Sequence, residues 1–267
     1  MHRRRRNLLL MGKKFDSNAK AYFNAAGITD RTERNAANTL IKGLKSNNLW
    51  SLCTALYMIS PTSLAAAAVN ARTPGTFDIT WVNTPSFSVN GVDFNGTTQY
   101  GRTGIVPSVD LSQFNFHLSY YSRENNANNA IEIGSISEIN TDVKIYCLWG
   151  GSTYSDTPYA AGNGRISFIR ATSAGFVIAS RITNNSHIMV INGSEVSSNA
   201  TVVSQTLSST ELYIGANNSN GTPVNYSNRE CICVSVGQAM TATQASTFNT
   251  LIEAYQDTVI SGGRGIQ

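Results

Sequence analysis

The sequence contains few charged residues. Asp, Glu, Lys and Arg make up 13% of the 267 residues, against about a quarter in an average soluble protein. Six of the 20 basic residues lie close to the N-terminus, at Arg3, Arg4, Arg5, Arg6, Lys13 and Lys14. The other 14 are outnumbered by 16 acidic residues. The body of the chain therefore offers no basic surface for nucleic acid, and nucleic acid is not expected as its partner. For the basic arm the sequence leaves four alternatives open: a site for nucleic acid, for an acidic protein surface or for a membrane face, or a solvated tail.

Histidine and long apolar runs are also scarce. The three histidines are His2, His117 and His187. His117 and His187 lie in strand-like runs, where a structural role is the expected one, so the sequence indicates no Ser-His-Asp triad. No run reaches the roughly 18 apolar residues that a membrane span needs, and the segment LLLM is too short for the core of a signal peptide. We expect no membrane partner.

The sequence lacks the residue clusters that hold metals or cleave sugars. The four cysteines, Cys53, Cys147, Cys231 and Cys233, lack zinc-site spacing and are expected to be reduced packing residues of a protein made in a cytoplasm. The nearest acidic group, Glu132, Glu138 and Asp142, spans a loop and does not place two carboxylates on one strand. Asn217, Asn218, Asn220 and Asn225 are typical of a turn, because neutral oxygens alone make a weak calcium site. We therefore predict no enzyme activity, no catalytic residues, no cofactor and no metal.

The N-terminal part of the chain, up to about residue 59, has a helical pattern. Asp16 or Ser17 can cap a helix that Gly27 ends, and Asp30 with Glu33 forms a capping box for a second helix. The apolar run over residues 49–59 predicts a third helix. Three short helices cannot cover each other's apolar faces, so we expect them to dock on the rest of the chain or on a neighbour.

After residue 73 the pattern changes to short strands. About nine runs of alternating or β-branched residues, among them FDITWV, KIYCLW, HIMVING and CICVSV, are separated by clusters of Asn, Gly and Ser. Such runs without intervening helices predict an antiparallel β-sandwich. Thr241 and Gln244 then cap a helix over residues 242–259 that is expected to pack on the outside of the sandwich. In VDFNGTTQYGRTG, residues 92–104, the glycines allow tight turns, and Phe94 and Tyr100 are spaced to pack into the sandwich.

The order of these segments resembles a known fold family. FNGTTQY, FNFHLSYYSRE, HIMVINGSEV, ELYIGA and CICVSVGQAMTATQ follow one another as in concanavalin A-like, laminin-G-like jelly rolls, over roughly residues 77–259. The N-terminal half, AAGITDRTERNAANTLIKGLKSNNLWSLCTALYMI followed by NGTTQY, is similar to bacteriophage virion proteins in which a small helical segment precedes such a jelly roll. The resemblance implies a mainly β fold in three parts. These are a basic arm (1–15), a helical attachment segment (16–72) and a concanavalin A-like domain with a C-terminal helix (73–267).

The stretch GGSTYSDTPYAAGNGR, residues 150–165, predicts a long surface loop. We expect it to bind a glycan or to form a subunit contact, because exposed aromatic rings beside amide and carboxylate groups suit sugars. The candidate ligand-binding residues are Trp149, Tyr154, Asp156, Tyr159 and Asn163.

These features lead to a non-enzymatic phage virion protein, such as a head fibre, spike, decoration or tail component. We expect its N-terminal region to attach it to other virion proteins or to copies of itself, with the sandwich projecting outward. The residues predicted to form this attachment are Arg3, Arg4, Arg5, Arg6, Leu49, Trp50, Leu56 and Tyr57. The sequence leaves two alternatives open, which are an adhesin that binds a host glycan and a glycanase that degrades polysaccharide.

Overall fold

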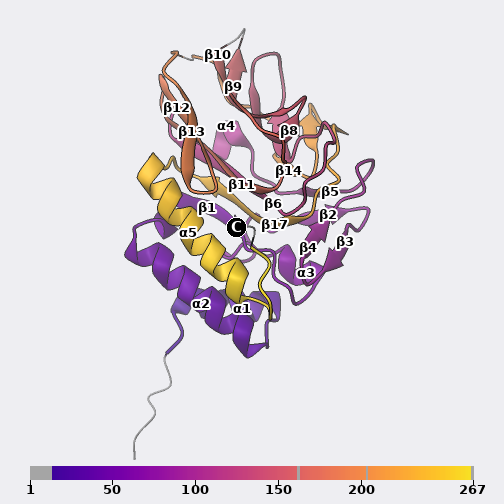
Figure 1. The fold of residues 1–267 in the computed structure, drawn as a ribbon, viewed down its shortest axis with the longest axis vertical. Helices are drawn as coiled ribbons and strands as arrows, with labels where there is room; N and C mark the ends of the chain where they lie inside the picture. The colour runs from indigo at the N-terminus through magenta and orange to yellow at the C-terminus, as the bar shows by residue number, and fades with distance from the viewer. Residues whose placement is uncertain (1–13, 161–162, 203, 266–267) are drawn as a thin grey trace, which may run out of the picture.

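The computed structural model describes residues 14–160, 163–202 and 204–265, with the side chains of residues 159, 160 and 163 excepted. Two β-sheets, antiparallel except for one short parallel pair, form a sandwich, and the longer helices lie together on one side of it (Figure 1). No helix in the described part of the chain is long and apolar enough to cross a membrane. The predicted mainly β, concanavalin A-like sandwich is confirmed.

The two N-terminal helices begin at the predicted caps. Helix α1 (Ser17–Ala26) begins where the Asp16 side chain accepts a hydrogen bond from the Asn18 N–H, and it ends at Gly27, which has a φ of 65°. Helix α2 (Arg31–Ser46) begins where Asp30 accepts a hydrogen bond from the Glu33 N–H. The Glu33 side chain does not close the capping box. It turns inward and accepts hydrogen bonds from the Ser60 and Thr62 hydroxyls.

The predicted third helix over residues 49–59 is wrong. The short 3₁₀ turn η1 (Trp50–Leu52) leads into strand β1 (Cys53–Tyr57), which pairs with strand β17 (Cys231–Gly237). Leu56 packs against the helices, whereas Tyr57 packs into the sandwich core. A strand that is buried on both faces has an unbroken apolar sequence, and such a run does not distinguish a strand from a buried helix.

This strand also corrects the predicted attachment surface. Leu49, Trp50, Leu56 and Tyr57 are all buried within the chain itself, so they are not available to a second protein. The other predicted attachment residues, Arg3 to Arg6, lie outside the described residues. The boundary expected between residues 72 and 73 does not separate two cores, because β1 belongs to the sandwich.

One sheet has eight strands and the other has nine. The eight-stranded sheet runs in the order β13 (Ser194–Asn199), β12 (Ser186–Ile191), β11 (Gly175–Thr183), β6 (Phe116–Ser122), β17, β4 (Gly91–Asp93) and β3 (Ser86–Ser88), with β1 beside β17. The nine-stranded sheet runs in the order β10 (Asn163–Ile169), β9 (Ser152–Ala160), β8 (Asp142–Trp149), β7 (Ile133–Ile136), β14 (Tyr213–Ile214), β5 (Tyr100–Arg102) and β2 (Thr80–Val82). The hairpin of β15 (Asn217–Ser219) and β16 (Thr222–Val224) extends from β7. Short helices α3 (Leu64–Ala67) and α4 (Pro107–Asp110) lie in connections.

Two apolar clusters hold the layers together. The cluster between the sheets includes Leu118 of β6, Val177 of β11 and Ile145 of β8. The second lies on the outer face of the eight-stranded sheet, where α1, α2 and the terminal helix α5 (Ala242–Thr258) cover that face (Figure 1). The predicted capping box of Thr241 and Gln244 is present at the start of α5. The helices thus dock on their own sandwich.

We predict that folding stability falls as the pH drops below about 6.5, in part because of His117. This fully buried ring lies between Gln238 O and Ser235 Oγ, and burial lowers its pKa to about 4. The unfolded chain binds this proton at a pKa of about 6.5, so the stabilisation is present above pH 6.5 and is lost as the pH falls toward 4. Urea unfolding of the protein and of His117→Gln across pH 4–7 tests this. A variant whose stability falls as steeply as that of the parent would contradict it.

Candidate functional site

The outer face of the nine-stranded sheet is a broad face that no long helix covers. Among the described residues, the helices of ten or more residues all lie on the other sheet. Register and core packing show which side chains point outward. Ile133 pairs with Ile145, and both face the core, so their strand neighbours Gly134, Lys144 and Tyr146 face outward. This outer face is called the open face below.

Residues 152–160 and 163–165 of the stretch GGSTYSDTPYAAGNGR lie in the paired strands β9 and β10, so the prediction of a long loop is wrong, and β9 also forms a hairpin with β8. Gly150 and Gly151 have φ values of 55° and 82° and form a tight turn between β8 and β9, where Trp149 pairs with Ser152. Thr153 and Ser155 are then fully buried on the inner side of β9. Polar Ser and Thr at inward positions conceal the alternation by which a strand is predicted from sequence.

The hairpin brings aromatic rings together on the open face. The ring of Tyr146 lies edge-on to Trp149 at 5.6 Å and to Tyr154 at 5.9 Å between centroids. The guanidinium of Arg165 lies 5.5 Å from the Tyr146 ring and 5.4 Å from the Tyr154 ring. Trp149 and Tyr154 are half-buried, so part of each ring remains open to a ligand.

Asp156 does not serve as an open ligand group. Its carboxylate is fully buried and takes two hydrogen bonds from Arg165, at 2.7 Å from Nε and 2.8 Å from Nη2. Burial raises the pKa of Asp156, and the two contacts with Arg165 oppose that rise. The backbones of Tyr159 and Asn163 lie in β9 and β10, but their side chains lie outside the described residues.

Two members of this cluster were missed by the sequence analysis. Tyr146 lies in the run KIYCLW at an outward position of β8, directly opposite Tyr154, and Arg165 lies opposite Asp156. The alternation of KIYCLW gave a signal for Tyr146. Arg165 carried none, because its place depends on the register between β9 and β10.

A second aromatic cluster lies near the other end of the open face. The ring of Tyr100 lies 4.6 Å from that of Tyr213 and 6.2 Å from that of Tyr226. Beside them Arg102 donates hydrogen bonds to Glu211, and both residues line a surface cavity of about 630 Å³ together with Tyr100 and Tyr213. Tyr100 was expected to pack into the sandwich. Instead it points outward, because Gly101 is the β5 residue that faces Ile79 and Trp81 at close approach.

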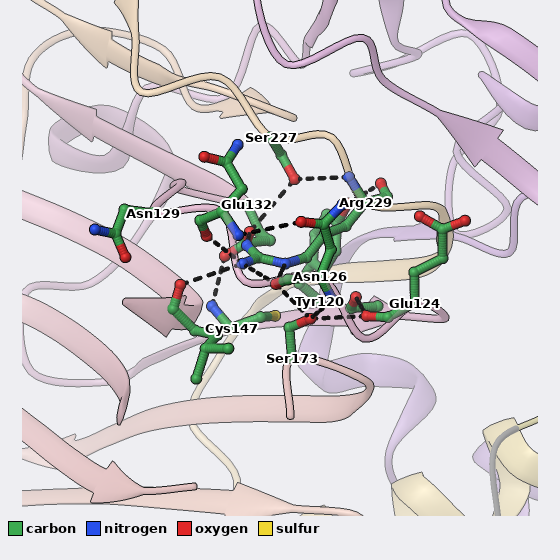
Figure 2. Close-up of polar contacts among 12 residues, drawn as sticks. Tyr120, Glu124, Asn126, Asn129, Glu132, Cys147, Ser173, Ser227 and Arg229 are labelled. Carbon is green, nitrogen blue, oxygen red and sulfur yellow. Dashed lines mark hydrogen bonds and ion pairs between the residues drawn. The ribbon is translucent and has the colours of Figure 1, made fainter. Parts of the chain in front are cut away.

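The acidic group considered for catalysis is dispersed. Asp142 forms an ion pair with Lys144, and Glu138 lies on an exposed turn. Glu132 is fully buried and forms an ion pair with Arg229 (Figure 2). Burial raises the pKa of Glu132, while the charge of Arg229 and the Cys147 N–H oppose that rise.

The pair of Glu132 and Arg229 ties several segments together (Figure 2). Glu132 accepts hydrogen bonds from the backbone N–H of Cys147 and from the hydroxyl of Ser227. Arg229 donates to the carbonyl oxygens of Asn126 and Leu148, at 2.8 and 3.2 Å from Nη2. The pair therefore stabilises the fold.

The two strand histidines and the Asn-rich turn lie in the structural surroundings that were expected for them. His117 has partners on both ring nitrogens, and His187 is fully buried. Asn218 Oδ1 accepts a hydrogen bond from the Gly221 N–H within its turn, and its Nδ2 donates to the carbonyl oxygen of Glu211. Within the described residues, no group of three His, Cys, Asp or Glu side chains is placed to hold a metal ion.

No protein-family model matches the chain, and no curated protein matches it. Solved structures do, at a TM-score of 0.52 in each of three cases. The HCR/D F1240A mutant is 10% identical, and the match covers 75% of this chain and 52% of the mutant's chain. The receptor binding domain of botulinum neurotoxin C/D mosaic serotype is 10% identical and covers 75% and 51%. A mutant of Trypanosoma rangeli sialidase displaying trans-sialidase activity is 12% identical and covers 82% and 39%.

The chain thus spans about half, or less, of the length of these proteins. At such low identity the likeness shows the fold alone, which is the jelly-roll sandwich.

We predict that Glu132→Gln lowers the free energy of unfolding by about 3–5 kcal/mol, because it leaves the buried Arg229 without its counter-charge. Glu138→Gln, at the exposed turn, is the control and should change stability by less than about 0.5 kcal/mol. Urea unfolding measures both. A loss below about 1 kcal/mol in Glu132→Gln would contradict a structural role for the pair.

Proposed function

We propose that this protein is a non-enzymatic component of a phage virion that presents the open face of its sandwich to other molecules. The virion assignment rests on the resemblance of the helical segment and the jelly roll to phage proteins. The observation that favours a binding role is the arrangement of the helices, which cover one sheet and leave the open face with its two aromatic clusters.

The carboxylates of the open face support a non-enzymatic role. Asp156 is held by Arg165, Asp142 by Lys144, and Glu211 by Arg102. Glycoside hydrolysis needs one carboxylic acid and one carboxylate on either side of the sugar bond. Ion-paired carboxylates with a basic partner at each are poorly suited to both roles.

Attachment to the particle is assigned to the basic arm, since the apolar residues once expected to share that role are buried in the chain. Four arginines near one end would be attracted to an acidic neighbour, and that attraction weakens with salt. Ala19 is the first fully buried residue among those described, and the variant below changes only residues 3–6 of the arm.

We predict that replacing Arg3, Arg4, Arg5 and Arg6 together by Ala leaves the melting temperature unchanged and greatly reduces incorporation into particles. Particles purified from the source of the gene would be assayed for the chain by quantitative mass spectrometry, at low and high salt. The matched control is Lys20→Ala, an exposed basic residue of α1. Absence of the unaltered chain from purified particles would contradict the virion role, and normal incorporation of the variant would contradict only the role of the arm.

Glycan binding is the second candidate function, and the cluster of Tyr146, Trp149 and Tyr154 favours it. Aromatic rings stack on the apolar faces of sugars, and the side chain of Arg165, which is 35% exposed, lies over the rings of Tyr146 and Tyr154. A ligand on this surface would contact the half-buried rings of Trp149 and Tyr154 directly.

For this second function, Tyr154→Ala should weaken binding to any glycan found on a sugar array by about tenfold, the loss of one central aromatic contact. Ile169→Ala, at a position 84% exposed on β10, is the control and should bind normally. Tyr100→Ala tests the second cluster. Loss of binding in Tyr100→Ala alone would place the glycan site at the second aromatic cluster. If the unaltered protein bound no glycan on the array, the glycan-binding function would be contradicted.

A further inference from the structure

Three arginines among the described residues are almost completely buried, and two of them have a partner for each side-chain nitrogen. Arg229 has the carboxylate of Glu132 and backbone carbonyl oxygens around it (Figure 2). Arg264 donates from Nε to Gln256, from Nη1 to the carbonyl of Val89, and from Nη2 to carbonyl oxygens of residues 58 and 59. Both side chains thus meet the general requirement that buried charges are paired or hydrogen-bonded.

Arg181 on β11 differs from these two. It is 1% exposed, and its Nε donates to the carbonyl of Thr157 at 2.7 Å and its Nη1 to the carbonyl of Asn184 at 3.2 Å. Its Nη2 has no hydrogen-bond partner. No acidic side chain among the described residues forms an ion pair with it.

Two further polar atoms without partners lie in the same place. Arg181 faces the space between the sheets, because Val177 and Ala179 on the same side of β11 belong to the inner core. His187 is its direct neighbour across β12, and Thr157 reaches it from β9 of the opposite sheet. Thr157 Oγ1 and His187 Nδ1 are both buried and unpartnered.

These atoms can all donate hydrogen bonds. Burial and the charge of Arg181 hold the pKa of His187 well below its usual value, so the ring is neutral at pH 7; the backbone of Gly164 opposes this shift without meeting hydrogen-bond geometry. Its Nε2 lies 3.1 Å from Ser155 Oγ, and a hydroxyl that donates to Nε2 leaves the proton of the ring on Nδ1. The guanidinium N–H, the threonine O–H and the imidazole N–H then belong to neighbouring residues and have no acceptor among the described residues.

A neutral molecule in this place would not satisfy the buried donors and the positive charge together. Burial lowers the pKa of Arg181 to about 10, which still leaves it protonated at neutral pH. A water molecule accepts through two lone pairs, so it would leave one of the three donors without an acceptor, and it carries no charge to compensate that of Arg181. An anion satisfies both the donors and the charge.

We propose that Arg181, Thr157 and His187 form a binding site for a small monatomic anion of the chloride type, between β9 and β11 of the sandwich. Three converging donors and one positive charge suit a single spherical anion. Sulfate or phosphate would bring four oxygens and a second negative charge that the described residues do not match. The bound ion would join the two sheets at this end of the sandwich.

The melting temperature of the whole chain in sodium chloride and in sodium gluconate, at equal ionic strength, tests the site. Chloride should raise it saturably relative to gluconate, because an ion that binds only the folded state stabilises it by mass action. Arg181→Met should abolish the difference. Arg102→Met, at an arginine whose side chain is 52% exposed, is the control and should keep it. Equal melting temperatures of the unaltered protein in the two salts would overturn the proposal.

A second variant keeps the test decisive if Arg181→Met does not fold. Thr157→Val preserves shape and removes one donor, so the chloride concentration at half-effect should rise about tenfold. Crystals grown in bromide should show an anomalous peak within hydrogen-bond distance of Arg181 Nη2. A water molecule at that position, or a bromide peak without any difference between salts in solution, would count against the proposal.

Discussion

The eight-stranded sheet carries apolar side chains on both of its faces, and the rest of the structure depends on covering them. Along β11, Val177 faces the other sheet, whereas Ile178 faces the helices. A sheet of this kind is stable only with a layer on each side. The second sheet provides one layer, and α1, α2 and α5 provide the other (Figure 1). This constraint brings the two ends of the sequence together and determines which broad face stays open.

The placement of the few charged residues is a second feature that determines the structure. With 13% charged residues, few ionisable groups are available, and many of them are used inside the fold. Arg229 with Glu132 joins loops to the nine-stranded sheet, and Arg264 fixes the C-terminal segment to backbone carbonyls. Arg181 has the same kind of buried position, but its Nη2 has no hydrogen-bond partner among the described residues, which is why an anion is inferred there. Buried arginines act here as connectors between segments that are distant in sequence.

The open face results from both features: no long helix covers it, and its charged residues are paired. Asp142, Asp156 and Glu211 on this face are each ion-paired with a basic side chain, so the half-buried aromatic rings are the groups on which a binding role is proposed. Tyr146, Trp149 and Tyr154 form one such area, and Tyr100 and Tyr213 form another. The proposed role is recognition and not acid–base chemistry, since recognition needs shape and stacking whereas catalysis needs titratable groups in two protonation states.

The sequence by itself determined the local features of this protein. Asp16, Asp30 and Thr241 cap helices because a short polar side chain bonds to nearby N–H groups, and alternation predicted the strands of the sandwich. Only the tertiary structure decided whether the run over residues 49–59 was a helix or a strand, because burial on both faces removes the periodicity that separates the two. It also decided that Asp156 is held by Arg165 and that Tyr100 points outward. Those outcomes depend on strand register and on contacts between distant residues, whose energies a local pattern does not contain.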